Sequence, residues 1–584
     1  MQRIETDVLV VGTGPAGASA ALALSTYGVP NIAVTRYGSL ADTPRAHITN
    51  QRTMEVLRDL GVEDRVIAQA TPQHLMSNTV FCSSLAGDEL GRLRSWGNDP
   101  LVRARHELAG PSRMCDMPQH LLEPVLVEAA VSRGTSLRFH TEYLSHEQDD
   151  EGVTALVKDR LRGDRYEIHA KYLIGADGGR SKVAENSGLP VNGRTGIAGS
   201  LNIVFEADLS AFTAHRPGTL YWVLAPGATV GGIGAGLVRC VRPWNEWMVV
   251  WGYDLDQGAP ELTEDYALSV IRPLIGDDTV PVKITSTSSW TVNQLYAERY
   301  RDRRVLCAGD AVHRHPPSNG LGSNTSIQDA YNLAWKLKLV LDGTASSALL
   351  DTYDAERVPV GKQIVERANK SIGETLPLFE SLDLLSTDDP DELWDRVEAR
   401  KAATPEGESA RDRLREAIAA KVYEFNAHGV EMNQRYSSAA VVPDGTPDPG
   451  YARDAELHYQ PTTRPGARLP HAWITRGRTG LSTLDLGGQG RFTVITGIGG
   501  DCWREAAEAA SRRWGLEIAT AVIGPGQEYE DPYGDWARLR ETGDGGCLLV
   551  RPDNHIAFRH PGADPAAAKL LTLALGQILA RDGE

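Results

Sequence analysis

Residues 7–28, DVLVVGTGPAGASAALALSTYG, decide the fold. The run DVLVV is short, apolar and rich in valine, which is typical of a strand buried in a parallel sheet. A GxGxxG turn follows it directly and opens a helix of small residues. This context lets the backbone approach a pyrophosphate closely and points the positive helix N-terminus at it, so a dinucleotide-binding α/β unit is predicted. The turn comprises Gly12, Gly14, Pro15, Ala16 and Gly17.

The second strand of this unit, NIAVT (31–35), lacks an expected acid. Dinucleotide-binding units usually carry Asp or Glu here, about 20 residues beyond the turn, to hold a ribose hydroxyl. Thr35 stands in its place and Arg36 follows. We expect the Thr35 hydroxyl to bond the ribose and Arg36 to pack on the adenine or meet phosphate. Loss of the charged contact predicts weaker retention of the dinucleotide.

Length and charge restrict the function classes. A chain of 584 residues, 41% hydrophobic and 23% charged, is too long for one core and has the composition of a soluble multidomain protein. Its net charge of −17 opposes contact with nucleic acid or an anionic membrane. A small-molecule substrate is therefore expected.

The six cysteines show no CxxC pair and no zinc-ligand spacing, which favours reduced thiols in the cytoplasm. The N-terminal residues enter a strand without the pattern of a signal peptide, and no apolar run is long enough to cross a bilayer. We therefore expect a cytoplasmic protein with no membrane span.

Changes of texture along the chain predict its organisation. We expect a discontinuous dinucleotide-binding domain (1–198 and 280–370), with a β-rich substrate domain (199–279, with parts of 75–110) inserted into it. One strand of that inserted domain is predicted at GGIGAGLV (231–238). A helical connecting segment (371–445) and a small α/β third domain (446–584) should follow, and the charged helical segment suits a dimer contact.

Two further motifs narrow the ligand. KYLIGADGGRSKV (171–183) is a strand running into Asp177 and Gly178, and the stretch from Arg303 to Leu337 is a strand, Gly309-Asp310, a Pro-Gly-rich loop and a helix. With the glycine turn, these motifs resemble the single-component FAD-dependent aromatic hydroxylases of the para-hydroxybenzoate hydroxylase fold. The third domain is similar to the thioredoxin-like C-terminal domain of the phenol hydroxylase branch. Because it lacks CxxC, a structural or dimerisation role is expected for it.

The resemblance implies a Rossmann-like FAD-binding domain whose Asp310 binds a ribityl hydroxyl of FAD. It also implies that the loop before the last helix holds the flavin ring, with backbone N–H groups aimed at the edge that becomes negative on reduction. Arg45 and Gln119 match positions near the pyrophosphate. Asp177 either lies near the FAD and NAD(P)H or caps the helix that begins at SKVAEN. The residues of the flavin loop are Pro317, Gly320, Gly322, Ser323 and Asn324, with Pro316 facing the substrate pocket.

The resemblance implies a monooxygenase that uses NAD(P)H and dioxygen. A flavin C4a-hydroperoxide would transfer oxygen to the carbon ortho to a phenol hydroxyl, giving a catechol; the phenol could be chlorinated. A bulkier aromatic, such as a polyketide or a hydroxybenzoate, is the alternative substrate. A disulfide reductase or dehydrogenase would need a redox cysteine pair or a second GxGxxG, and neither is present. An idle flavin-binding partner remains a third hypothesis, and a homo-oligomer, dimer or tetramer, is expected.

A base for the phenol is predicted in PRAHITNQRTME (44–55). Free phenol has a pKa of roughly 10, so forming the anion at pH 7 costs about 4 kcal/mol. His47 aligns with an Asp near the substrate hydroxyl in phenol hydroxylases and can accept the proton; the alternatives are that it only orients the substrate or is structural. Tyr221 and Trp222 are candidates for the pocket wall, although alternation sends half of a strand elsewhere. Arg239 would either meet an acidic substrate or lie at the surface.

Overall fold

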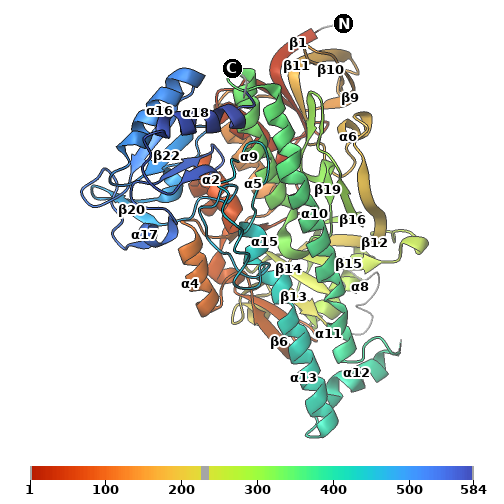
Figure 1. The fold of residues 1–584 in the computed structure, drawn as a ribbon. Coiled ribbons are helices and arrows are strands. Elements are labelled where there is room, and N and C mark those ends of the chain that lie inside the picture. Colours follow the sequence, from red (N-terminus) through yellow and green to blue (C-terminus); the bar gives the residue numbers. More distant parts are fainter. Residues whose placement is uncertain (1–2, 225–235, 388, 582–584) are drawn as a thin grey trace.

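The computed structural model describes residues 3–224, 236–387 and 389–581. Most of the predicted strand GGIGAGLV, residues 231–235, lies outside the described residues. The described part contains two large sheets and one small sheet whose strands are interleaved along the chain, and the C-terminal unit packs beside the first sheet (Figure 1).

The first sheet is parallel at its centre, as predicted. β1 pairs in parallel with β2 on one side and β11 on the other, and β11 pairs in parallel with β18. The carboxyl ends of these strands therefore meet at one edge, which is where ligands bind in such sheets. The strands are β1 (Arg3–Val11), β2 (Asn31–Val34), β8 (Ser136–Arg138), β9 (Thr141–Gln148), β10 (Val153–Asp159), β11 (Arg165–Gly175), β17 (Arg301–Asp302) and β18 (Val305–Cys307).

Helices cover this sheet and supply much of its core. α1 packs against both α5 and α9, and the first turn of α2 is capped by the side chain of Asn50, which accepts from the backbone N–H of Thr53. The helices of the first 350 residues are α1 (Pro15–Thr26), α2 (Gln51–Asp59), α3 (Glu63–Ile67), α4 (Pro100–Ala109), α5 (Gln119–Ser132), α6 (Lys182–Asn186), α7 (Ser210–Thr213), α8 (Glu264–Ile275) and α9 (Gly322–Leu341).

The second sheet is antiparallel over most of its width and extends beyond the predicted range 199–279. β12 and β16 pair along most of their length, and β16 ends at Ala297 after pairing with β19. These long strands physically connect the two sheets, which explains the difference. Residues from 75–110 add two strands to this sheet. In sheet order the strands are β19 (His313–Arg314), β16 (Lys283–Ala297), β12 (Val191–Glu206), β15 (Glu246–Tyr253), β14 (Leu237–Arg242), β13 (Gly218–Val223), β5 (Asn78–Cys82) and β6 (Glu89–Arg94).

A three-stranded sheet lies between the large ones in sequence and positions the candidate site. Its central strand is β7 (Cys115–Asp116), flanked by β3 (Ile48–Thr49) and β4 (Thr71–Pro72). Asp116 is the register partner of Ile48 on one side and of Thr71 on the other. This sheet fixes the residue before β3, His47, beside Asp116.

A helical segment follows, and its α12 and α13 project at the lower end of Figure 1. It comprises α10 (Asp351–Gly373), α11 (Leu376–Ser381), α12 (Pro390–Ala399), α13 (Pro405–Ala420), α14 (Val422–Phe425) and α15 (His428–Met432).

The third unit is a small α/β structure whose four-stranded sheet has the order β23-β22-β24-β25. α16 and α18 pack on each other. Trp335 of α9 meets Phe492 edge-on, with 6.0 Å between ring centroids, so the unit shares its core with the first. Its elements are β20 (Trp473–Arg476), β21 (Thr479–Ser482), β22 (Phe492–Thr496), α16 (Asp501–Trp514), β23 (Ile518–Val522), α17 (Asp535–Leu539), β24 (Cys547–Val550), β25 (Ile556–His560) and α18 (Ala567–Ile578).

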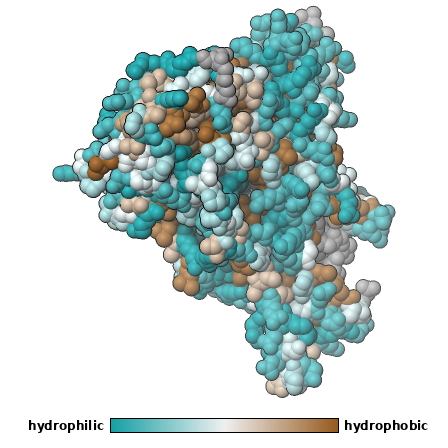
Figure 2. Space-filling model, in the orientation of Figure 1, coloured by the Kyte–Doolittle hydropathy of each residue, from teal (hydrophilic) through white to brown (hydrophobic). Residues whose placement is uncertain are grey.

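The face of the molecule in Figure 2 is mainly hydrophilic, with apolar side chains scattered in small groups. Among the described residues, no helix has both the length and the apolar character that a membrane crossing requires.

Candidate active site

The glycine turn has the shape that the motif predicts. Gly12 has φ +109°, and a Cβ there would lie 2.1 Å from the carbonyl oxygen of Ala176; a Cβ at Gly17 would lie equally close to that of Gly12. Only glycine fits at either position. Gly14 is the N-cap of α1 without a side-chain cap, and a Cβ there would meet only Glu123 Oε1, at 3.8 Å. The free N–H groups of α1 thus face open space, which suits a phosphate.

The DG motif is committed to helix capping. The Asp177 carboxylate accepts from the backbone N–H groups of Lys182 (2.8 Å) and Val183 (3.2 Å) and from the Ser181 hydroxyl. The capping interpretation is therefore confirmed. The motif also borders the glycine turn, because a Cβ at Gly12 would lie 3.1 Å from the Asp177 nitrogen. Gly178 has φ +80° and nothing near its missing Cβ, so it leaves space beside the turn.

Asp310 is a carboxylate without a protein donor among the described residues. It lies in the short 3-10 helix η3 (Gly309–Ala311), and its side chain reaches solvent. Burial nevertheless raises its pKa, against the opposing charges of His313, Arg314 and Arg45. A partly desolvated carboxylate with no partner fits a ligand hydroxyl, such as the ribityl hydroxyl that the resemblance assigns to it.

The flavin loop ends in an uncapped helix. Gly320 has φ +62°, and a Cβ there would lie 3.0 Å from that of Ile48, so the loop touches the segment that follows His47. α9 then begins at Gly322 without a side-chain cap, which leaves its first N–H groups free. Gly322 and Ser323 are half-buried, Pro316 is buried and Pro317 is exposed.

Asn324, predicted to contact the flavin, has a side chain that bonds to three groups of the protein. Its side-chain nitrogen donates to the carbonyl oxygens of Ile48 (2.7 Å) and Gly320 (2.6 Å), and its oxygen accepts from the Asn50 N–H at 2.9 Å. The side chain is buried. Asn324 therefore joins the flavin loop to the His47 segment.

The remaining nucleotide candidates lie around the glycine turn. Thr35 is buried, and its hydroxyl accepts a long 3.4 Å bond from the Tyr37 N–H. Arg36 packs over the Tyr37 ring, 5.0 Å from its centroid. Gln119 donates its side-chain amide to Glu123, while its backbone N–H donates to Ala46, next to the exposed Arg45.

His47 and Asp116 form a buried pair. His47 Nδ1 lies 2.8 Å from Asp116 Oδ2, and the two side chains are 15% and 1% exposed. Burial lowers the His47 pKa, Arg239 lowers it further, and Asp116 opposes them. The imidazole is therefore neutral at pH 7. Since the carboxylate accepts the Nδ1 proton, Nε2 carries the lone pair and is free to act as a base.

Arg239 lies beneath the His47 segment, not at the surface. It is 3% exposed, and one guanidinium nitrogen donates to the carbonyl oxygen of Pro44 at 2.6 Å. Its Nε and Nη2 have no partner within the part of the chain that the structure describes. Burial lowers the pKa of Arg239 to about 10, so the group stays charged beside the His47–Asp116 pair. This cation can stabilise a negative charge that develops there.

The two aromatic candidates on β13 point in opposite directions. Trp222 belongs to an apolar cluster with Ile48, the neighbour of His47. Tyr221 lies in another cluster, meets Trp247 edge-on and donates its hydroxyl to the Arg216 carbonyl at 3.1 Å. The alternation of side chains along a strand explains this separation. The structure thus brings Trp222, and not Tyr221, toward the predicted substrate side.

Buried ion pairs connect the GD loop to helix α10. Asp329 of α9 accepts from the Gly309 N–H at 3.1 Å, lies 2.8 Å from His313 Nε2 and accepts from Arg357 Nε at 2.7 Å. All three side chains are fully buried. Although burial alone would raise its pKa, Arg357 and His313 lower the pKa of Asp329. The loop that carries Asp310 is therefore held from behind by an ionised carboxylate.

The residue of α10 that precedes Arg357 extends these pairs into the third unit. Glu356 accepts two bonds from Arg551, at 2.6 and 2.9 Å, and one from Lys336 at 2.8 Å. All three side chains are fully buried. We call the set of Asp329, His313, Arg357, Glu356 and Arg551 the buried ionic relay.

Sequence reasoning missed Asp116, the burial of Arg239, and Asp329. Asp116 is 69 residues from His47, and no local pattern joins them. A weak signal existed for Asp329, since it interrupts the apolar helix SIQDAYNLAWKL.

Comparison with known proteins gives the family. Residues 5–368 match the FAD binding domain family, and residues 462–581 match the aromatic-ring hydroxylase C-terminal family. The chain is 54% identical to 2,4-dichlorophenol 6-monooxygenase of Delftia acidovorans, covering 99% of this chain and 98% of that protein. It is 50% identical to phenol 2-monooxygenase of Pseudomonas sp. strain EST1001, covering 97% and 92%.

A solved structure agrees over the whole chain. The flavin-dependent monooxygenase PieE, in complex with FAD and substrate, superposes with a TM-score of 0.95 at 46% identity, covering 99% of each chain. The resemblance predicted from the three motifs is confirmed. The chain therefore belongs to the FAD-dependent aromatic-ring hydroxylases and is a flavin-dependent monooxygenase.

Proposed function

We propose that this enzyme hydroxylates a small phenol, plain or chlorinated, at the ortho carbon to give a catechol. The observation that carries the proposal is the His47–Asp116 pair placed directly against the flavin loop. Two relatives that share about half of their residues with this chain are named for 2,4-dichlorophenol and phenol. Their names support a small phenol as the substrate, rather than a polyketide or a hydroxybenzoate.

The protein's part in catalysis begins with the phenol proton. We infer that the substrate hydroxyl donates to His47 Nε2, while Asp116 accepts from Nδ1 and stabilises the imidazolium that forms. A phenol pKa of roughly 10 against an imidazole below 6.5 makes full transfer uphill by about 5 kcal/mol in water. The charge of Arg239 and the ion pair formed with His47 reduce this cost. The phenolate directs oxygen to its ortho carbon.

FAD fits the residues present: the uncapped α1 and α9 N-termini, the open space at Gly14 and the unpartnered Asp310 carboxylate. When bound, FAD supplies the redox chemistry, taking electrons from NAD(P)H and transferring one atom of dioxygen to the ring. We assign Asp310 to the ribityl chain, the turn from Gly12 to Gly17 to the pyrophosphate, and Arg45 to the same phosphate. Trp222 and Pro316 are assigned to the substrate pocket.

NAD(P)H is proposed as the co-substrate that delivers the electrons, and dioxygen as the second co-substrate. Consumption of NADH and NADPH, measured in parallel with phenol, tests this and gives the preference. We also propose a homo-oligomer, dimer or tetramer, which sedimentation would test. A reducing compartment, the cytoplasm, is proposed from the cysteines, all six of which are free thiols.

One experiment tests the proposed function. The FAD-loaded enzyme is given phenol, 2,4-dichlorophenol, 4-hydroxybenzoate and a polycyclic phenol, and aromatic products are quantified beside hydrogen peroxide. We expect catechols from the first two and mostly peroxide from the others. Peroxide alone from the small phenols, with product from a larger ring, would overturn the proposal in favour of the bulkier substrate.

A further inference from the structure

A cavity of about 410 Å³ lies behind the His47–Asp116 pair, on the far side of the three-stranded sheet. Its inner wall includes Pro72 of β4 and Cys115 of β7, which are register partners. Asp116 follows Cys115, and alternation along β7 places its side chain on the opposite face, toward His47. Neither His47 nor Asp116 lines the cavity, nor does any residue of the glycine turn or the flavin loop, so the cavity is distinct from the site described above. Its other lining residues come from α2, α3, α4, the segment before α4, η1 (Gln73–Met76) and the segment before β7.

The inner wall is apolar. Its side chains are either pure hydrocarbon or carry only a thiol or a thioether. They are Ile67, Ala70, Pro72, Pro111, Met114 and Cys115. An apolar cavity of about 150 Å³ suffices for benzene. The volume here accommodates one or two aromatic rings, in the range usual for small-molecule sites.

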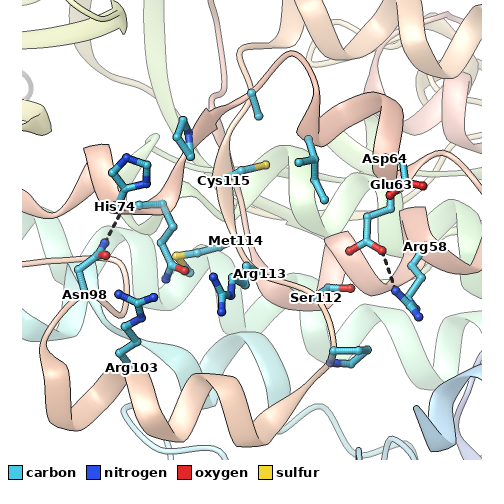
Figure 3. A pocket seen from close by; sticks show the side chains of 15 residues that line it. Arg58, Glu63, Asp64, His74, Asn98, Arg103, Ser112, Arg113, Met114 and Cys115 are labelled. Carbon is cyan, nitrogen blue, oxygen red and sulfur yellow. Dashed lines mark hydrogen bonds and ion pairs between the residues drawn. The ribbon is translucent and has the colours of Figure 1, made fainter. Parts of the chain in front are cut away.

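Charge is distributed unevenly around this cavity. In Figure 3, Arg103 rises from α4 near Arg113, whereas Glu63 and Asp64 lie at the other end. Arg103 and Arg113 share a single carboxylate, Glu107, at 3.1 and 3.2 Å.

The two guanidinium groups carry two positive charges against the one negative charge of Glu107, so one positive charge is left over. Their side chains are 47% and 65% exposed, so they are free to turn toward a ligand. In a chain with a net charge of −17, this is a local attraction for an anion.

The opposite end of the cavity has more acidic groups than cations. Arg58 donates two bonds to Asp485 and one to Glu63, so it has no surplus charge to offer. Burial raises the pKa of Glu63. A second anionic group on a ligand would face Glu63 and Asp64 and be repelled, so the site selects one negative charge at the arginine end.

We propose that this cavity binds a small aromatic monoanion, with its rings on the apolar wall and its carboxylate on Arg103 and Arg113. The occupant contacts β7, the strand whose Asp116 orients His47. The ligand is thus an effector held behind the catalytic pair and not a substrate.

Titration calorimetry of the FAD-loaded enzyme with 2-naphthoate tests the proposal, with neutral 2-naphthamide as the matched probe. We expect one saturable naphthoate site that persists when phenol is saturating. Because each charge-assisted bond is worth about 1.5–3 kcal/mol, the Arg103→Gln/Arg113→Gln variant should bind at least about tenfold more weakly. Arg105→Gln, on the same helix but outside the cavity, should bind as the parent does.

A second variant separates the cavity from the charges. Ile67 is 52% exposed, so Ile67→Trp leaves the core intact and reduces the space for the rings; it should weaken naphthoate binding by a similar factor. Absence of saturable binding would overturn the proposal. So would binding that phenol displaces and that neither the arginine nor the Ile67 change affects, because that site would be the flavin site.

Discussion

The Nδ1 atom of His47 lies 2.8 Å from Oδ2 of Asp116, whose other oxygen is buried and has no partner among the residues that the structure describes. The carboxylate therefore has one committed task, which is to hold the imidazole with Nε2 outward. This geometry makes the tautomer of His47 depend on a residue on another strand.

The Asp116→Asn variant should lower kcat/KM for phenol by about 10²-fold, because an amide can also donate to Nδ1 and stabilise the wrong tautomer. Asp116 raises the His47 pKa, so its loss should move the acidic limb of the kcat/KM profile to lower pH. Both are measured by steady-state kinetics across pH. Asp150→Asn, at the exposed surface, is the control. An unchanged profile in Asp116→Asn would show that the pair has no catalytic role.

The His47→Ala variant should discriminate between substrates. Turnover of phenol should fall by about 10²–10⁴-fold, the usual contribution of a general base. 2,4-Dichlorophenol is already more acidic and needs less help, so its loss should be clearly smaller. Product formation on the two phenols gives the ratio. Equal losses would mean that His47 orients the ring and does not take the proton.

Replacing Asp310 should release the cofactor. Removing a hydrogen bond to a charged group costs about 1.5–3 kcal/mol, so Asp310→Ala should raise the Kd for FAD by about 10–100-fold. Quenching of flavin fluorescence on binding to the apoprotein measures it. Glu298→Gln, a nearby exposed acid, should bind FAD as the parent does. If Asp310→Ala retains parental affinity, the ribityl assignment fails.

The buried ionic relay makes the third unit necessary to the first. Arg551→Met leaves Lys336 as the cation bonded to buried Glu356 and removes the ion pair with Asp553, so the free energy of unfolding should fall by about 3–5 kcal/mol. Arg504→Met, on the exposed face of α16, should change it by less than about 0.5 kcal/mol. Denaturant titration compares the two. A parental unfolding midpoint in Arg551→Met would contradict the importance of the relay.

Asp59 should make stability depend on pH. It accepts from the Tyr331 hydroxyl (2.8 Å) and the Gln489 N–H (2.9 Å), and burial raises its pKa to about 7. The folded protein thus binds a proton that the unfolded chain loses above about pH 4. Stability should therefore fall as pH rises from about 4 through 7, by at most about 4 kcal/mol. Denaturant unfolding at several pH values should show a flatter dependence in Asp59→Asn.

Structural features that depend on a local sequence pattern could be predicted, whereas contacts between segments far apart in the sequence could not. The glycine turn, the parallel strands and the unpartnered acid Asp310 follow from motifs within a few residues of each other. The His47–Asp116 pair could not be predicted, because register in a three-stranded sheet brings together residues 69 positions apart. Tyr221 and Trp222 show the limit of period-two reasoning: it says that neighbours diverge, but not which of them faces the site.

The three bonds of Asn324 have a consequence for how the molecule opens. Gly320 on the cofactor side, and Ile48 and Asn50 on the side of His47, are all bonded to this one side chain, so displacing Asn324 breaks the bonds to both segments together. Both loops should therefore open as one cooperative unit. The rate of hydrogen exchange at the Asn50 amide would then report the opening that admits the flavin ring, although Asn50 lies outside the flavin loop.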